Sequence, residues 1–273
     1  MLKTRIITAC CLAAGLAVVL LLFSFHAFVA LFSLIFLVAA GEWANMVGLA
    51  QRGQQVAYAG VMACAMLALF FLDAYQAGSV LTVSLALSVL GWVLTFVAVR
   101  RYPNVKLFEH PNVLLFLGFW LLLPAWLGML FLQPLVAHSG LVWLVIAIIA
   151  AADIGAYFAG RRFGKHKLAE RVSPNKTWEG FWGGVLANIV LAVLVAVFCN
   201  VSVLKSFVLI VSVMLISCAS VLGDLFESMV KRARGIKDSS QLLPGHGGVM
   251  DRIDGWTAAV PVFALLYLWG AVL

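Results

Sequence analysis

The sequence predicts an all-α, polytopic integral membrane protein with about nine transmembrane helices. Of its 273 residues, 64% are hydrophobic and only 11% are charged, and the mean hydropathy is +1.10. Hydrocarbon offers no water to backbone N–H and C=O groups, so long apolar segments must satisfy these groups internally as helices. The alternation of apolar and polar residues that membrane-spanning strands need is absent from the sequence, which disfavours a β-barrel.

The spans follow from apolar runs, each compared with the roughly 20 residues that a helix needs to cross a bilayer. We expect them near residues 6–24, 27–48, 56–72, 79–99, 113–132, 141–160, 180–199, 206–227 and 256–272. The first run is similar to a secretory signal peptide, but no cleavage site of small residues separates it from the second run. We therefore expect the first run to be retained as a helix.

Basic residues fall almost entirely on one side of this arrangement. Seventeen of the 18 Lys and Arg residues lie in the N-terminal segment or beside alternate loops, including Lys106 after the fourth span, and only Lys205 lies opposite. Lys and Arg favour cytoplasmic loops, so the N-terminus and these loops are predicted to be cytoplasmic. The basic residues behind the net charge of +7 then serve to orient the helices and to interact with anionic lipid headgroups. We therefore expect no nucleic-acid partner.

The distribution of charge divides the chain into two regions. Residues 1–132 are predicted to be a scaffold of transmembrane helices, either with a dimer contact or with a surface that faces lipid. The sequence indicates no chemistry there, and Glu42 is interpreted as a polar anchor at a helix end. Residues 133–273 are predicted to be the catalytic region, with cytoplasmic loops at residues 161–179 and 228–255.

Four aspartates of the second region converge on the predicted cytoplasmic boundary. Asp153 and Asp224 lie toward the inner ends of their spans, and Asp251 and Asp254 come just before the last span. An aspartate at mid-helix costs roughly 2.5–3.5 kcal/mol to insert, so such residues usually face a cavity or a partner. The sequence therefore indicates a polar site at this boundary, although it gives no role to Asp153.

Helical spacing adds detail around Asp224. If the eighth span continues through GDLFESMVKR, Asp224, Ser228 and Lys231 lie on one helical face. The alternative for Asp224 is an interfacial ion pair with Lys231 or Arg232.

The residues around these aspartates suit a phosphate substrate and Mg²⁺. Magnesium prefers a few carboxylates combined with water and substrate oxygens, and basic residues neutralise phosphate charge. The glycines of PGHGG, residues 244–248, let backbone N–H groups turn toward an anion, although a tight turn is the alternative. SPNKT, residues 173–177, suits a phosphate or nucleotide grip, but a polar loop without a ligand would have a similar composition.

Residues 228–254, SMVKRARGIKDSSQLLPGHGGVMDRID, resemble the signature of the phosphatidate cytidylyltransferase family, also called CDP-diacylglycerol synthases. The family pattern is a serine, one residue, an aliphatic residue, KR, four residues, KD, a short gap, HGG and DRxD, and every fixed position is met. SPNKTWEGFWGG, residues 173–184, is similar to the second conserved stretch of the family. The resemblance implies a nucleotidyltransferase of phospholipid biosynthesis at the cytoplasmic face of a bacterial inner membrane. It would condense CTP with phosphatidic acid to give CDP-diacylglycerol and pyrophosphate.

The resemblance and the charge pattern together imply roles for individual residues. The predicted catalytic residues are Asp224, Lys237 and Asp251. The predicted Mg²⁺ ligands are Asp224, Asp251 and Asp254, and a second cation is left open. The predicted substrate-binding residues are Ser173, Lys176, Thr177, Ser228, Lys231, Arg232, His246, Gly247, Gly248 and Arg252. A phosphate monoester is already anionic at neutral pH, so catalysis should depend on alignment and charge neutralisation rather than on a strong base.

Two other functions remain open at this point. A CTP-dependent polyprenol or dolichol kinase would also need CTP at a membrane, but it would transfer the γ-phosphoryl group and release CDP. A cation-coupled transporter would place charges near mid-bilayer in related halves, whereas these charges collect at one boundary and the sequence shows no internal repeat. The expected partners are CTP, phosphatidic acid and membrane lipids, and a homodimer is left open. Acyl-chain preference and the residues that select cytosine are not specified by the sequence.

Overall fold

The computed structural model describes residues 2–105, 110–136 and 139–272, and within these ranges it contains nine α-helices and one two-stranded sheet. The elements are α1 (Leu2–Leu22), α2 (Phe25–Val47), α3 (Arg52–Phe71), α4 (Ser79–Arg101), α5 (Pro111–Leu132), α6 (Gly140–Phe163), β1 (Lys167–Ala169), β2 (Ser173–Thr177), α7 (Trp178–Phe198), α8 (Val203–Arg234) and α9 (Met250–Leu268). The predicted all-α fold class is confirmed.

Seven helices of the described chain, α2 to α8, are long and apolar enough to cross a membrane. The helix α1 contributes a shorter apolar stretch, Cys10–Leu22. The helix α9 has 19 residues and carries Asp251, Arg252 and Asp254 near its start. The nine expected spans thus correspond to nine helices in the described residues, of which seven meet the requirement for crossing. Lys106, which contributed to the predicted orientation, lies outside the described residues.

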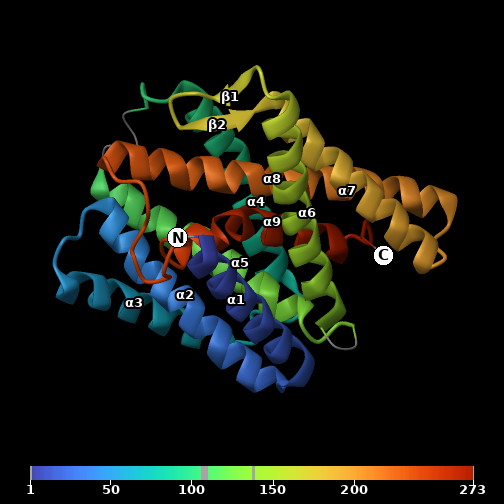
Figure 1. Ribbon diagram of the computed structural model, residues 1–273. Helices are drawn as coiled ribbons and strands as arrows, with labels where there is room; N and C mark the ends of the chain where they lie inside the picture. The colour runs from blue at the N-terminus through green and yellow to red at the C-terminus, as the bar shows by residue number, and fades with distance from the viewer. Residues whose placement is uncertain (1, 106–109, 137–138, 273) are drawn as a thin grey trace.

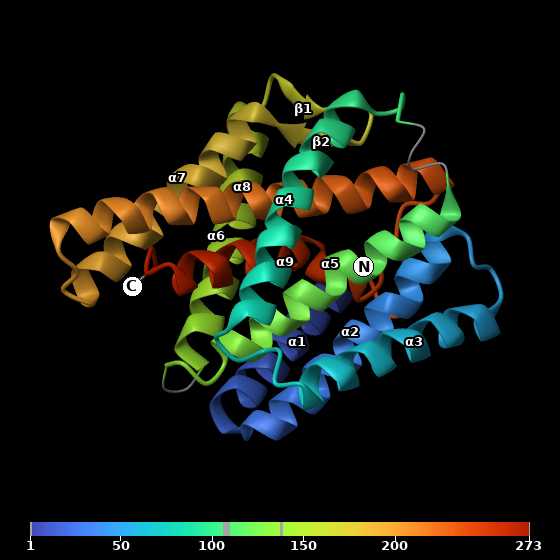
Figure 2. The same ribbon diagram turned by 180° about the vertical axis from the view of Figure 1, so that it is seen from behind.

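The helix α9 lies in the middle of the bundle, between α8 on one side and α4 and α5 on the other (Figures 1 and 2). Its inner face consists largely of small residues, such as Ala258, Ala259 and Ala264, which are fully buried and let neighbouring helices approach. Trp126 of α5 and Phe263 of α9 belong to the same hydrophobic core. Helices from both halves of the chain therefore form one packed unit around α9.

The helices α6 and α7 approach closely because glycines lie in their interface. A Cβ atom on Gly155 would lie 2.6 Å from the carbonyl oxygen of Gly183, and one on Gly184 would lie 2.6 Å from that of Ala152. Small residues at such positions allow helix backbones to pack in a membrane. This packing holds the segment that connects the two helices at one end of the pair (Figure 1).

The connecting segment forms a β-hairpin rather than the open loop expected at residues 161–179. The strands β1 and β2 pair antiparallel, with Lys167 opposite Thr177. The Thr177 hydroxyl accepts a hydrogen bond from the Gly180 N–H at 3.1 Å and thereby caps α7. The SPNKT segment is therefore a strand that leads directly into a transmembrane helix.

The helix α8 has 32 residues. Its length is roughly 48 Å, well beyond the ~30 Å of a hydrocarbon core. Lys205 lies near its start and Lys231 in its last turn, so these lysines lie at opposite ends of the helix. The helix stops at Gly235, whose φ of +74° is a conformation that glycine adopts without a Cβ penalty. The predicted loop at residues 228–255 is consequently reduced to residues 235–249, because SMVKRAR is helical.

Candidate active site

Two cavities open where the aspartate-bearing parts of α6, α8 and α9 meet the hairpin and the loop before α9. The first has a volume of about 580 Å³ and is walled by α6, the hairpin, α7 and α8. The second has a volume of about 610 Å³ and is walled by residues 237–247 together with Arg252. The predicted binding residues of the SPNKT segment line the first cavity, and several of those in the family signature line the second.

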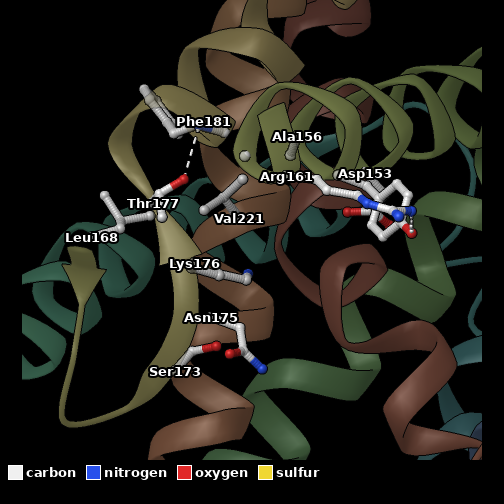
Figure 3. A pocket seen from close by; sticks show the side chains of 13 residues that line it. Asp153, Ala156, Arg161, Leu168, Ser173, Asn175, Lys176, Thr177, Phe181 and Val221 are labelled. Atoms are coloured by element: carbon white, nitrogen blue, oxygen red, sulfur yellow. Dashed lines mark hydrogen bonds between the residues drawn. The ribbon is translucent and has the colours of Figure 1, made fainter. Parts of the chain in front are cut away.

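Asp224 and Lys176 form an ion pair beside the first cavity. Figure 3 shows this cavity, with Lys176 on β2 and Asp153 on α6 among the residues of its wall. The Lys176 Nζ lies 2.6 Å from Asp224 Oδ2, and Ser228 Oγ donates to Asp224 Oδ1 at 3.2 Å. The predicted helical face with Asp224 and Ser228 is thus formed, and the direct ion-pair partner of Asp224 is Lys176 of β2.

Two further carboxylates, Asp153 and Asp254, share the electrostatic environment of this pair. Asp153 interacts with Lys176, Asp224 and Arg252. Asp254 interacts with Asp224 and Lys176. Asp153 and Lys176 line the first cavity, and Arg252 lines the second. This arrangement makes Asp153 part of the site, whereas the sequence alone gave this residue no role.

Asp251 belongs to a second cluster, which holds the loop before α9. Its Oδ2 accepts hydrogen bonds from the Gly248 N–H at 2.8 Å and from the Ser239 N–H and hydroxyl, both at 3.0 Å. Its Oδ1 lies 2.6 Å from the Lys231 Nζ, which also binds Glu227 Oε2 at 2.7 Å. The three charged side chains are buried, with exposed fractions of 8% for Asp251 and Lys231 and 1% for Glu227. Both oxygens of Asp251 therefore already have protein donors.

Lys231 and Arg232, which were predicted to bind substrate, have protein partners in this structure. Lys231 bridges two carboxylates, and Arg232 donates to the carbonyl oxygens of Val172 and Ile236, each at 3.3 Å. These contacts tie α8 to the hairpin and to the loop that follows α8. A phosphate-binding role for either residue stays a prediction.

Four of the predicted site residues in the last quarter of the chain line the second cavity. They are Lys237, His246, Gly247 and Arg252. Gly247 has a φ of +80°, and a Cβ atom there would collide with the Asp251 carboxylate, so both its backbone conformation and its close packing require glycine. Within the described part of the chain, the buried His246 Nδ1 has no hydrogen-bond partner. His246 lines the second cavity with other parts of its side chain, because this nitrogen is itself covered by protein.

The described residues contain no group of three or more His, Cys, Asp or Glu side chains that could hold a metal ion alone. Asp224 and Asp254 nevertheless supply hard oxygen donors from two helices, and a cationic ammonium already binds one of them. Such a pair fits Mg²⁺, which uses one or two protein carboxylates and completes its shell with water and substrate phosphate. Asp251 fits less well, because three donors bind its Oδ2 and the buried Lys231 ammonium binds its Oδ1, whereas each oxygen of Asp224 has one donor.

Two buried acidic residues of the site, Glu42 on α2 and Glu227 on α8, were not among the predicted site residues. Glu42 contacts the loop before α9, and Glu227 contacts Lys231. Each is a carboxylate within an apolar span, and this is the one feature of the sequence that could have indicated a functional role for them. The sequence does not reveal which distant segment such a carboxylate meets.

Comparisons with known proteins bear on the chemistry of this site. The chain matches the model of the cytidylyltransferase family over residues 3–269. It is 44% identical to the phosphatidate cytidylyltransferase of Pseudomonas aeruginosa over 273 residues, which cover 99% of this chain and 98% of that protein. It is 38% identical to the enzyme of the same name from Haemophilus influenzae over 298 residues, covering 98% of this chain and 99% of that protein. These matches confirm the resemblance that residues 228–254 carry.

Proposed function

The chain belongs to the cytidylyltransferase family, and from this premise we propose that it condenses CTP with phosphatidic acid to form CDP-diacylglycerol and pyrophosphate. The observation that carries the proposal is the ion pair of Lys176 with Asp224 beside the first cavity, in a chain that matches phosphatidate cytidylyltransferases over nearly its full length. The reaction joins a membrane substrate to a soluble one. One cavity walled by membrane helices and one walled by a polar loop suit such a reaction.

We assign the phosphatidate headgroup to the first cavity. Its walls include apolar residues of membrane helices, such as Phe181 and Val221, beside the polar Ser173, Lys176 and Thr177. On the outer faces of α6 and α7, Phe158 and Trp182 are 65% and 57% exposed. The acyl chains can therefore remain in lipid along these faces while the phosphate enters the polar end.

We assign CTP to the second cavity, whose wall is the glycine-containing loop. Lys237 and Arg252 supply positive charge for the triphosphate. The electrostatic interaction of Asp153, in the wall of the first cavity, with Arg252, in the wall of the second, supports the placement of both substrates at one site.

The chemical step requires little from a general base. An oxygen of the phosphatidate monoester attacks the α-phosphorus of CTP, a new P–O bond forms, and the bond to the β-phosphate oxygen breaks as pyrophosphate leaves. The attacking oxygen is already anionic, so alignment and charge neutralisation dominate. Lys176 holds the phosphatidate, and Lys237 and Arg252 neutralise the triphosphate. Asp224 and Asp254 would hold Mg²⁺, whose charge would add to this neutralisation of phosphate.

We further propose that the protein resides in a bacterial inner membrane with this site on the cytoplasmic side. The relatives are bacterial, and the site lies at helix ends that carry most of the basic residues, such as those of α6 and α8. A second cation and association into a homodimer stay predictions.

The direct test is product analysis with purified protein in lipid nanodiscs. CTP, phosphatidic acid and Mg²⁺ should give CDP-diacylglycerol and pyrophosphate in equal amounts, and removal of divalent cations with EDTA should stop the reaction. Release of CDP with a phosphorylated lipid would indicate a CTP-dependent kinase instead. Failure to turn over CTP at all by folded protein would favour a transporter.

Replacing Lys176 with alanine should weaken binding of phosphatidic acid. The loss of one hydrogen bond to a charged group, about 1.5–3 kcal/mol, predicts a KM for phosphatidic acid that is higher by about tenfold or more. Steady-state kinetics in mixed micelles at varied surface concentration of the lipid would measure it. Lys167→Ala is a matched control on the same hairpin, because the Lys167 Nζ binds the carbonyl oxygen of Pro174. Equal KM values for the two variants would contradict the assignment of Lys176.

A further inference from the structure

We propose that Glu42 of α2 is a positioning residue for this reaction, which holds the loop at residues 237–249 in the shape that forms the second cavity. The inference rests on the proposed function, since it assumes that this cavity binds CTP. It concerns the N-terminal half of the chain, where the sequence pattern indicates only scaffold helices.

The carboxylate of Glu42 accepts four hydrogen bonds, all from a segment 197 to 208 residues later in the chain. Its Oε1 accepts from the Ser240 hydroxyl at 2.6 Å and from the Val249 N–H at 3.1 Å. Its Oε2 accepts from the Met250 N–H at 2.7 Å and from the Ser239 hydroxyl at 3.1 Å. The side chain is only 8% exposed, so these donors replace water around a buried charge.

The four donors come from the two ends of one loop. Ser239 and Ser240 lie before the glycine-rich turn, and Val249 and Met250 lie at the start of α9. The first N–H groups of a helix have no partner within the helix, and an anion there also interacts favourably with the helix dipole. One carboxylate thus binds both ends of the loop and closes the turn at residues 241–248, which lines the second cavity.

The contact extends from Glu42 to Asp251 through Ser239. The Ser239 Oγ lies 3.1 Å from Glu42 Oε2 and 3.0 Å from Asp251 Oδ2, so the two carboxylates share its single hydroxyl hydrogen. A Cβ atom on Gly248 would collide with the Ser239 hydroxyl and with the Glu42 carboxylate. Little free space remains here, so a displacement of the Glu42 side chain must move the loop.

The hydrogen bonds that Glu42 accepts require a carboxylate, and an amide cannot reproduce them. Each oxygen of Glu42 faces one backbone N–H, that of Val249 or of Met250, and a backbone N–H can only donate. Glutamine in either orientation would point its NH₂ group at one of these donors. A serine hydroxyl can rotate to accept a hydrogen bond, but the backbone cannot. Glu42→Gln therefore leaves a buried N–H unpaired although the side chain keeps its size.

The test is a kinetic comparison of Glu42→Gln with the wild-type chain in nanodiscs, with CTP and phosphatidic acid varied separately. We expect the KM for CTP to rise by about tenfold or more, while the KM for phosphatidic acid changes by less than about twofold. Asp73→Asn is the matched control, because Asp73 is an exposed carboxylate of the same half in the turn between α3 and α4. A purely structural role would lower the active fraction and the maximal rate and would leave both KM values unchanged.

Hydrogen exchange and a second variant provide two independent tests of the role of Glu42. Hydrogen exchange of the peptide containing Val249 and Met250 should be faster in Glu42→Gln. Should that variant fail to fold, Ser240→Ala removes one donor and keeps the backbone contacts, and we expect a rise of about two- to fivefold in the KM for CTP. An unchanged KM for CTP in whichever of these variants folds would overturn the inference. Absence of CDP-diacylglycerol synthesis by the wild-type chain would instead overturn the proposed function.

Discussion

Replacing Asp224 with asparagine is expected to lower turnover by about 1000-fold or more while the protein still folds. The amide has nearly the same shape, but it lacks the charge that binds the Lys176 ammonium at 2.6 Å. The amide would also be a poorer ligand for Mg²⁺ than the carboxylate. Initial rates of CDP-diacylglycerol formation in nanodiscs would measure the loss, and the residual activity should require a higher Mg²⁺ concentration.

Glu170→Gln provides the control for this variant. Glu170 is an exposed carboxylate in the turn of the hairpin, so its replacement removes one negative charge near the site without touching Asp224. We expect wild-type turnover for Glu170→Gln. Near-normal turnover of Asp224→Asn, with correctly folded protein, would remove Asp224 from the catalytic site.

Replacing Lys231 with alanine is expected to destabilise the protein by about 3–5 kcal/mol, because it leaves buried carboxylates without their counter-charge. Lys231 lies 2.7 Å from Glu227 and 2.6 Å from Asp251, and neither carboxylate is more than 8% exposed. Loss of the ammonium should also release the loop that Asp251 holds through Gly248 and Ser239. Thermal unfolding in detergent, followed by tryptophan fluorescence, would measure the change.

Lys205→Ala is the matched control, since Lys205 is an exposed lysine at the other end of α8. It should leave the unfolding temperature nearly unchanged, because an exposed charge contributes little. If Lys231 instead acts mainly by binding substrate phosphate, Lys231→Ala would unfold like Lys205→Ala and would show only a raised KM. That result would support the role predicted from the sequence and contradict the role inferred from the ion pairs.

The order of the helices and the position of the site along the chain are properties that hydropathy and charge could predict. A backbone in hydrocarbon must form helices, so apolar runs define α1 to α9 with boundaries that differ by several residues. Helical periodicity likewise places Asp224 and Ser228 on one face of α8, and their hydrogen bond confirms it. The motif at residues 228–254 identified the family. These features depend on local sequence and on the membrane, which act on each segment separately.

The partners of the polar side chains depend on which helices become neighbours, and hydropathy does not encode this. A helix that is apolar on all sides can pack against several others, so the sequence leaves open that α2 lies beside the loop before α9. The contacts of Glu42 with Ser239 and Met250, and the pairing of Lys176 with Asp224, join segments far apart in the chain. Once packing excludes water, each buried charge must find a counter-charge or a donor on whichever segment is adjacent. Tertiary packing therefore decided that Glu42 of the scaffold helices holds the loop of the second cavity, and that Asp251 binds Lys231 and the loop before α9.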